Sequence, residues 1–184
     1  TIGNADFYSA NLEGARFVDE SSDESSAIND TRQLIWNTDF TNADLTSAAL
    51  SGIQFEESSF DFATLDKADL RGAMLPGAQF LNAGLRGANL QDANLSGANL
   101  HHAKLVGANL QNANLSGANL RYAKLVGANL QNARLSYADL SYADLTGADL
   151  RGAILAGACF EQATLKDTLF SPGDKILLTV SGGI

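Results

Sequence analysis

Residues 91–110 read QDANLSGANLHHAKLVGANL and residues 111–130 read QNANLSGANLRYAKLVGANL, so the two stretches are identical at 17 of 20 positions. A five-residue pattern lies inside this 20-residue repeat. From Phe40 to Phe170 every fifth residue is Leu or Phe, at 27 positions without exception, and Ala stands two residues before 23 of them. A unit of five within a unit of 20 means four short units per turn. Short repeats of fixed period are typical of solenoids, whose units bury their apolar faces by stacking on one another.

The spacing of the apolar residues excludes ordinary helices and strands. Amphipathic helices need apolar spacings of three and four, and half-buried strands alternate strictly, whereas here spacings of two and three alternate. Two inward residues on each five-residue side, followed by a corner, produce this pattern. We therefore predict an all-β helix of square section. Ala and the central Leu or Phe point into it, and the other three residues of each unit face solvent.

Strings such as ANLSG, ANLQN, AKLVG and ADLTG resemble the repeats of the pentapeptide-repeat protein family, and they cover about nine-tenths of the chain. The resemblance implies a right-handed quadrilateral parallel β-helix with four pentapeptides per 20-residue coil, here about 7.5 coils. It also implies a bacterial protein of cyanobacterial type, and it assigns no particular biochemistry.

Residues 1–184 are predicted to form a single β-helical domain with one interruption. Phe7, Leu12 and Phe17 stand two residues out of phase with the later centres, which places an acidic insertion at residues 18–37. If Ile35 supplies the missing fourth centre of the first coil, Phe7 lies beneath Phe40. The helical spacing of Ile28, Thr31, Leu34 and Ile35 also predicts one short helix in this segment, packed by Trp36.

The tail at residues 171–184 is predicted to cap the C-terminal end of the solenoid. Pro172 and Gly173 stop the repeat, and residues 176–180 are apolar enough to fold across the open end. The N-terminal end has only a few residues to cover it. Because uncovered solenoid ends expose strand edges and core, we expect an end-to-end dimer there.

The composition and charge of the chain exclude several classes of protein. The formal net charge is −9, distributed as −11 over residues 1–70 (14 acids, 3 bases), +5 over residues 71–138 (1 acid, 6 bases) and −3 over residues 139–184 (6 acids, 3 bases). This pattern lacks the continuous basic stripe of a nucleic-acid binder. Cys159 is the only cysteine, which excludes an intramolecular disulfide, and no apolar run is long enough to span a membrane. We expect a soluble protein of the cytoplasm, the periplasm or the thylakoid lumen.

Two surfaces are candidates for binding a partner protein. The first is the acidic run of the insertion, which also has the residue types of a cation site but lacks the spacing of a calcium loop. The second is a predicted ridge, where aromatic rings replace small corner residues beside a basic column. The acidic candidates are Asp19, Glu20, Asp23 and Glu24; the ridge candidates are His102, Lys104, Arg121, Tyr122, Lys124 and Tyr142.

The sequence therefore favours a non-catalytic structural scaffold or protein-interaction module. No residues are placed for a nucleophile relay or a metal site, and no catalytic residue, metal or cofactor is predicted. The alternative function follows from the family resemblance: some members mimic DNA and inhibit or protect a DNA-binding enzyme such as DNA gyrase. Those members carry acidic residues along most of their length, whereas residues 71–138 of this chain have a net charge of +5.

Overall fold

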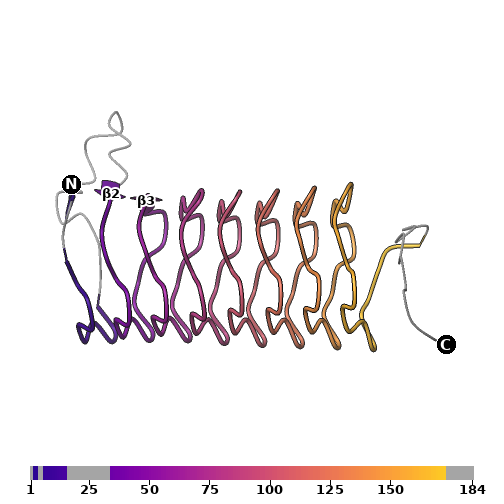
Figure 1. The fold of residues 1–184 in the computed structure, drawn as a ribbon, viewed down its shortest axis with the longest axis horizontal. Coiled ribbons are helices and arrows are strands. Elements are labelled where there is room, and N and C mark those ends of the chain that lie inside the picture. The colour runs from indigo at the N-terminus through magenta and orange to yellow at the C-terminus, as the bar shows by residue number, and fades with distance from the viewer. Residues whose placement is uncertain (1, 4–5, 16–33, 173–184) are drawn as a thin grey trace, which may run out of the picture.

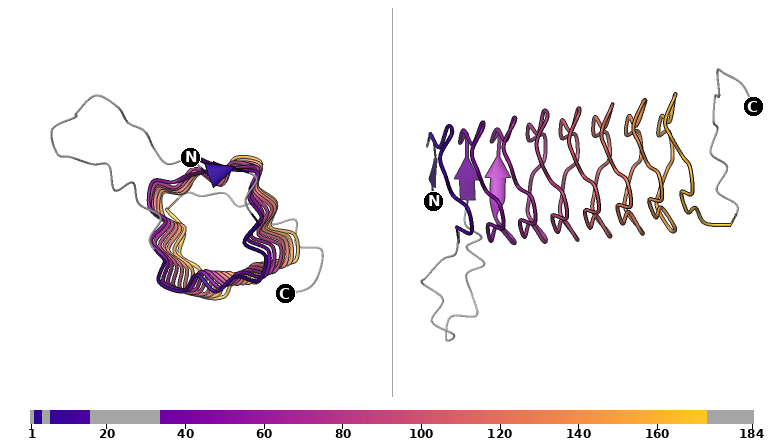
Figure 2. Two further views of the ribbon diagram at one scale, coloured as in Figure 1. Left: turned by 90° about the vertical axis from the view of Figure 1, so that its left-hand side faces the viewer. Right: turned by 90° about the horizontal axis from the view of Figure 1, so that it is seen from below.

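The computed structural model describes residues 2–3, 6–15 and 34–172, which wind in successive coils along one axis (Figure 1). Seen along that axis, the coils superimpose into a four-sided outline (Figure 2). Three short strands, β1 (Ile2–Gly3), β2 (Leu34–Trp36) and β3 (Gln54–Glu56), pair in parallel in the order β1-β2-β3. Beyond them, single parallel bridges connect residues 20 apart, such as Asn99 and Asn119. The 20-residue period of the sequence is thus one coil of the structure.

Each side of a coil hydrogen-bonds to the coils before and after it. The Asn119 N–H donates to the Ala98 carbonyl at 2.9 Å, and the Asn119 carbonyl accepts from the Leu100 N–H at 2.8 Å. Side-chain amides add further ladders on three sides of the coil; on one of them Asn129 donates to Asn109 and Asn109 donates to Asn89, both at 3.2 Å. Stacking of identical residues therefore satisfies backbone and side-chain groups together.

The corners explain why the units favour Asn or Asp before the central residue and a small residue two places after it. At one corner the Ala98 N–H donates to the Leu95 carbonyl at 3.0 Å, and Gly97 between them has φ +66°. This is the arrangement of a type II turn, which requires a residue in the left-handed region. The side chain of Asn109 accepts the N–H of Gln111 at 3.2 Å, which fixes the chain entering the next corner.

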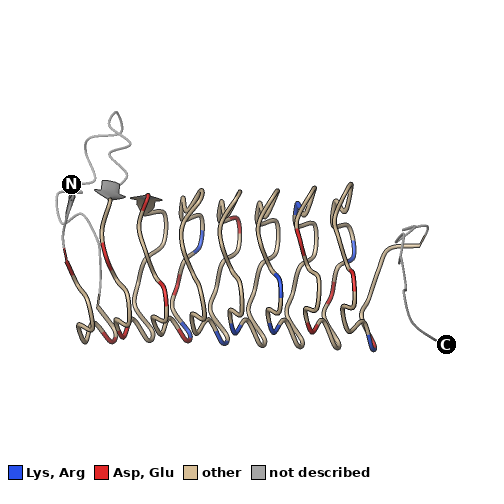
Figure 3. Cartoon of the chain, in the orientation of Figure 1, with Lys and Arg blue, Asp and Glu red and all other residues tan. Residues whose placement is uncertain are grey.

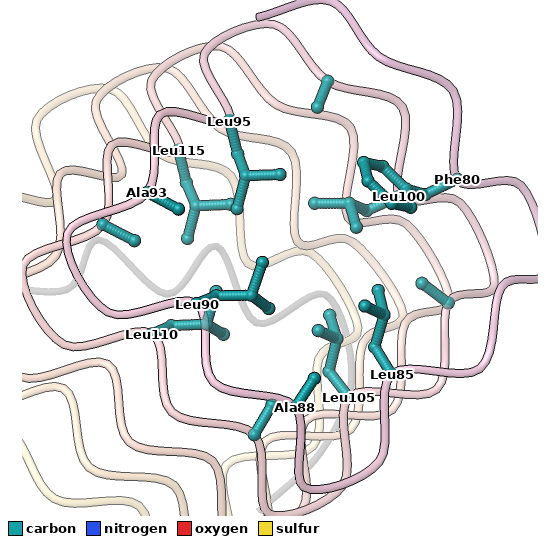
Figure 4. Packing of buried hydrophobic residues seen from close by; sticks show 14 of the residues in the cluster. Phe80, Leu85, Ala88, Leu90, Ala93, Leu95, Leu100, Leu105, Leu110 and Leu115 are labelled. Atoms are coloured by element: carbon teal, nitrogen blue, oxygen red, sulfur yellow. The ribbon is translucent and has the colours of Figure 1, made fainter. Parts of the chain in front are cut away.

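The core confirms the predicted inward residues. Every central Leu or Phe from Phe40 to Leu150 is at most 1% exposed, and the smaller residues two places earlier are buried with them. Figure 4 shows the labelled leucines from Leu85 to Leu115 pointing inward from successive sides of two coils. Thr38, Ile53 and Ser58, which replace Ala in this pattern, are buried as well. The short side chain of Ala leaves room for the large central residues to meet at the axis.

The phenylalanines form a stack inside the core, which we call the aromatic spine (Phe7, Phe40, Phe60 and Phe80). Consecutive ring centroids lie 5.1, 4.9 and 4.9 Å apart, with interplanar angles of 8° or less. Phe55 meets Phe40 and Phe60 edge-on at 6.0 and 5.1 Å. The predicted position of Phe7 beneath Phe40 is confirmed.

The insertion is shorter than predicted, and part of the predicted helix is wrong. Leu34–Trp36 is strand β2, with Ile35 paired to Ile2 on one side and to Phe55 on the other. Pairing on both sides satisfies the backbone of these residues, which outweighs their helical spacing. Registers of 33 residues, such as Asp6 with Asp39, replace 20 here, so the insertion adds 13 residues and the coil resumes by residue 34.

Several predictions fall outside the described residues. These are the conformation of the acidic insertion at residues 16–33, the position of Phe17 and the tail from residue 173 onward. The count of about 7.5 coils, the C-terminal cap and the end-to-end dimer also stay predictions. Within residues 2–3, 6–15 and 34–172 there is no helix long and apolar enough to cross a membrane.

Candidate functional site

One corner of the β-helix carries a stack of exposed rings, which we call the corner ridge (His101, His102, Arg121, Tyr122 and Tyr142). The rings of His102 and Tyr122 stack at 5.0 Å, and those of Tyr122 and Tyr142 stack at 4.8 Å. Tyr122 and Tyr142 remain 40% and 42% exposed. The coil repeat sets these separations, because the three rings project from the same corner of consecutive coils.

The backbone under these rings is in a conformation that bulky residues rarely adopt. His102, Tyr122 and Tyr142 have φ of 59°, 58° and 62°, the left-handed region in which glycine is most at ease. At other corners the equivalent position is often glycine, as at Gly97 and Gly107. The ridge therefore bears a local conformational cost of about 1–2 kcal/mol per residue, which stacking of the rings offsets in part.

The guanidinium of Arg121 lies over the rings of Tyr122 and Tyr142, and its charge is neutralised by Asp139. Its guanidinium carbon lies 5.8 Å from the ring centroid of Tyr122 and 5.5 Å from that of Tyr142, within cation–π range. One of its terminal nitrogens also donates to the Asp139 carboxylate at 3.2 Å. This hydrogen bond raises the pKa of Arg121 above its usual value. Burial of Asp139 opposes its ionisation, but hydrogen bonds from Ser141 and Arg121 lower its pKa overall.

His101 is the less exposed of the two histidines. Its ring meets His102 edge-on at 4.3 Å and Tyr122 edge-on at 5.5 Å. Partial burial, followed by the nearby His102 and Arg121, lowers the pKa of His101 below its ordinary value. This environment therefore disfavours the charged form of the His101 imidazole.

Lys104 and Lys124 lie on the face that follows the corner ridge, in one column as predicted; the column continues through Asp144 to Thr164 and does not end at Asp144. Parallel bridges connect Lys104 to Lys124 and Lys124 to Asp144 on consecutive coils. The two lysines are exposed. The carboxylate of Asp144 accepts from the backbone N–H and the hydroxyl of Thr146, at 3.0 and 2.6 Å. The predicted ridge residues are therefore brought together at one corner and its adjoining face.

Sequence reasoning missed two further aromatic residues at the same corner. Phe62 is 52% exposed with φ of 60°, and it precedes Asn82 by one coil in the column of His102. Tyr8 is exposed one residue before the left-handed Ser9, at the same corner of the first coil. Counting back in steps of 20 finds Phe62 directly. Tyr8 follows from the predicted position of Phe7 beneath Phe40, a 33-residue register that the structure confirms.

The charges follow the predicted polarity along the axis. Acidic segments dominate the N-terminal coils, and basic segments appear from the middle coils onward (Figure 3). Four arginines of the described residues form salt bridges, and all four partners are aspartates: Asp69 with Arg71, Asp66 with Arg86, Asp139 with Arg121 and Asp149 with Arg151. The acidic candidates Asp19, Glu20, Asp23 and Glu24 lie outside the described residues, so their role as a binding surface stays a prediction.

The described coils offer no arrangement of groups for a metal. Among residues 2–3, 6–15 and 34–172, no cluster of three His, Cys, Asp or Glu side chains could hold an ion. Cys159 is exposed, as predicted, with its sulfur 3.2 Å from the Ser141 hydroxyl.

The fold and the ladder of repeats define a β-helical solenoid of five-residue units. The profile of the family described as Pentapeptide repeats matches eight copies, at residues 34–61, 53–92, 63–101, 93–132 and 128–167. The chain therefore belongs to the pentapeptide-repeat family, whose members form right-handed β-helices.

Solved structures of this family resemble the chain to different degrees. HetL, a pentapeptide repeat protein involved in heterocyst differentiation regulation from the cyanobacterium Nostoc sp. strain PCC 7120, is 29% identical with a TM-score of 0.58; the match covers 91% of this chain and 84% of HetL. A pentapeptide repeat protein of the Arabidopsis thaliana thylakoid lumen is 35% identical with a TM-score of 0.43, over 52% of this chain and 63% of that one. Rfr23 from the cyanobacterium Cyanothece 51142 is 34% identical with a TM-score of 0.36, over 58% and 66% of the respective chains. No curated protein matches the sequence.

Proposed function

We propose that the protein is a non-catalytic interaction module whose partner protein docks on the corner ridge. The observation that carries the proposal is the exposed stack of His102, Tyr122 and Tyr142 on left-handed backbone. Glycine or asparagine at these positions would avoid the conformational cost, as at Asn42 and Asn82 of the same column. Exposed tyrosines beside an arginine are the residue types that contribute most to protein interfaces.

The charge distribution argues against DNA mimicry as the way in which this chain binds its partner. A DNA mimic presents acid along most of its length, whereas residues 71–138 here carry 1 acid and 6 bases. The involvement of HetL in regulation of differentiation agrees with a binding role for a similar chain.

Affinity capture with the full chain tests the proposal. The variant Tyr122→Ser/Tyr142→Ser removes the stack, and Tyr137→Ser serves as the matched control. Tyr137 is a 78% exposed tyrosine on left-handed backbone at a different corner. We expect the double variant to capture at least tenfold less of a partner protein than the wild type does, as quantified by mass spectrometry. The control should capture the same amount as the wild type.

The competing interpretation is that the rings only shield a corner of the solenoid. In that case the double variant changes the melting temperature but captures the same proteins as the wild type. Unchanged capture, with circular dichroism showing a folded chain, would refute the corner ridge as the docking surface.

A further inference from the structure

The face next to the corner ridge carries two lysines that the described fold does not neutralise. We call the surface formed by Lys104, Val106, Gly107, Lys124 and Gly127 the lysine face. Lys104 and Lys124 are paired neighbours on consecutive coils, so their charged side chains start about 4.8 Å apart. Like charges directly opposite each other in a sheet are destabilising. Within residues 2–3, 6–15 and 34–172, neither lysine forms a salt bridge, in contrast to Arg121.

The sequence around the two lysines is poor in acids, and Lys104 has no acid on the adjacent coils of its column. No Asp or Glu occurs between Asp92 and Asp139, a stretch that includes both lysines. The nearest acid in their column is Asp144, which is paired with Lys124 on the next coil without forming a salt bridge to it; Oδ1 of Asp144 accepts two hydrogen bonds from Thr146, and Lys104 lies between Gly84 and Lys124 in the column. A carboxylate from outside the chain would reduce the repulsion between the lysines and find two donors one coil apart.

The lysine face is also open to close approach. A Cβ atom added at Gly107 or Gly127 would meet nothing within 4 Å, so no side chain stands over these corners. Val106, between Lys104 and the first of these glycines, is 37% exposed. A partner backbone can therefore lie against this face, with apolar contact beside the charged groups.

We propose that Lys104 and Lys124 bind the carboxylates of a short acidic segment of a partner protein, which lies along the solenoid axis beside the corner ridge. This inference rests on the proposed function, because it names the chemistry of the segment that docks there. The basic column spans two coils and is followed by Asp144, and the whole chain carries a net charge of −9. A segment with a few carboxylates fits the short stretch of the column that Lys104 and Lys124 occupy. A nucleic-acid strand, with a phosphate on every nucleotide, would extend past it into repelling acids.

Fluorescence anisotropy with a short labelled polyglutamate peptide tests this chemistry, with polyglutamine and oligothymidylate as comparison probes. The test variant is Lys104→Gln/Lys124→Gln. The matched control is Lys67→Gln/Lys166→Gln, which changes the net charge equally at two exposed lysines outside the lysine face. Two exposed ion pairs predict that the test variant binds polyglutamate about three- to tenfold more weakly, while the control changes by less than about twofold. Wild-type affinity should also fall as salt increases.

Three results would overturn the inference: absence of polyglutamate binding, equal weakening in the two double variants, or tighter binding of oligothymidylate that depends on Lys104 and Lys124. Partner capture separates this inference from the proposed function. Capture that still requires Tyr122 and Tyr142 while polyglutamate fails to bind refutes only the acidic segment. Capture that is indifferent to the tyrosines refutes the docking role of the corner ridge, whatever the peptide does.

Discussion

Replacement of Phe60 by Leu measures what ring stacking adds to burial in the aromatic spine. The ring of Phe60 stacks on Phe40 and on Phe80 at 4.9 Å each, and Phe55 meets it edge-on at 5.1 Å. Phe80 is equally buried, but its one ring neighbour among the described residues is Phe60. Leu100 continues the same column, so leucine fits the site at either position.

The magnitude follows from counting ring pairs. A stacked or edge-on pair contributes about 0.5–1.5 kcal/mol beyond the area that it buries. Phe60→Leu removes three pairs and Phe80→Leu removes one, while the loss of buried area is similar in both. We therefore expect Phe60→Leu to lower the free energy of unfolding by about 1–3 kcal/mol more than Phe80→Leu. Phe60→Ala, which adds a cavity, should cost about 3–5 kcal/mol in all.

Equilibrium urea unfolding followed by circular dichroism gives these free energies. Because coils of a repeat protein can unfold in parts, hydrogen exchange of the amides of Phe60 and Phe80 provides a local measurement of the same difference. Equal losses for the two leucine variants, in unfolding and in exchange, would refute a contribution of stacking beyond burial.

Three further predictions concern the interior, the corners and the charged face. Ala118 is 1% exposed among the packed leucines, so Ala118→Leu should overpack the core and lower stability by about 1–3 kcal/mol; an unchanged melting temperature would contradict the tight interior. Phe62 is half exposed on left-handed backbone, so Phe62→Asn should maintain stability or raise it by up to about 1 kcal/mol, and a clear loss in urea unfolding would show that the ring contributes more than its strain costs. The hydrogen bond from Arg151 is the main reason why the pKa of Asp149 lies well below its usual range. Burial opposes this shift, and a hydrogen bond from Gln131 adds to it. An unfolded Asp has a pKa of about 3.9, so the stabilisation from Asp149 is complete above this pH and is lost as the pH falls toward the lower folded value. Asp149→Asn should flatten the dependence of unfolding free energy on pH in this acidic range, and an equally steep dependence would argue against the ion pair.

The sequence predicted the interior in detail because a period of five leaves few arrangements. Ala108 and Leu110 must face the same way as every other residue at their places in the unit, and both are buried. The same reasoning put His102, Tyr122 and Tyr142 in one column. It predicted that these residues are neighbours, but the direction of each ring and the partner of each charge depend on side-chain conformation.

The insertion shows where the repeat stops being informative. Leu34 and Ile35 have helical spacing within their own segment, yet they form strand β2 because β1 and β3 offer hydrogen bonds on both sides. That outcome depends on a partner strand 33 residues earlier in the chain, about which the helical spacing within one segment carries no information.

By itself the sequence determined the β-helix, the direction of each buried residue and the column of each corner residue, since every unit of five repeats the same two inward positions and the same corner. Only the tertiary structure decided that Asp139 neutralises Arg121 and that, within the described residues, Lys104 and Lys124 form no salt bridge. These facts depend on contacts between side chains of different coils. The interaction energy of such side chains depends on the distance between them, which a small change in register would alter.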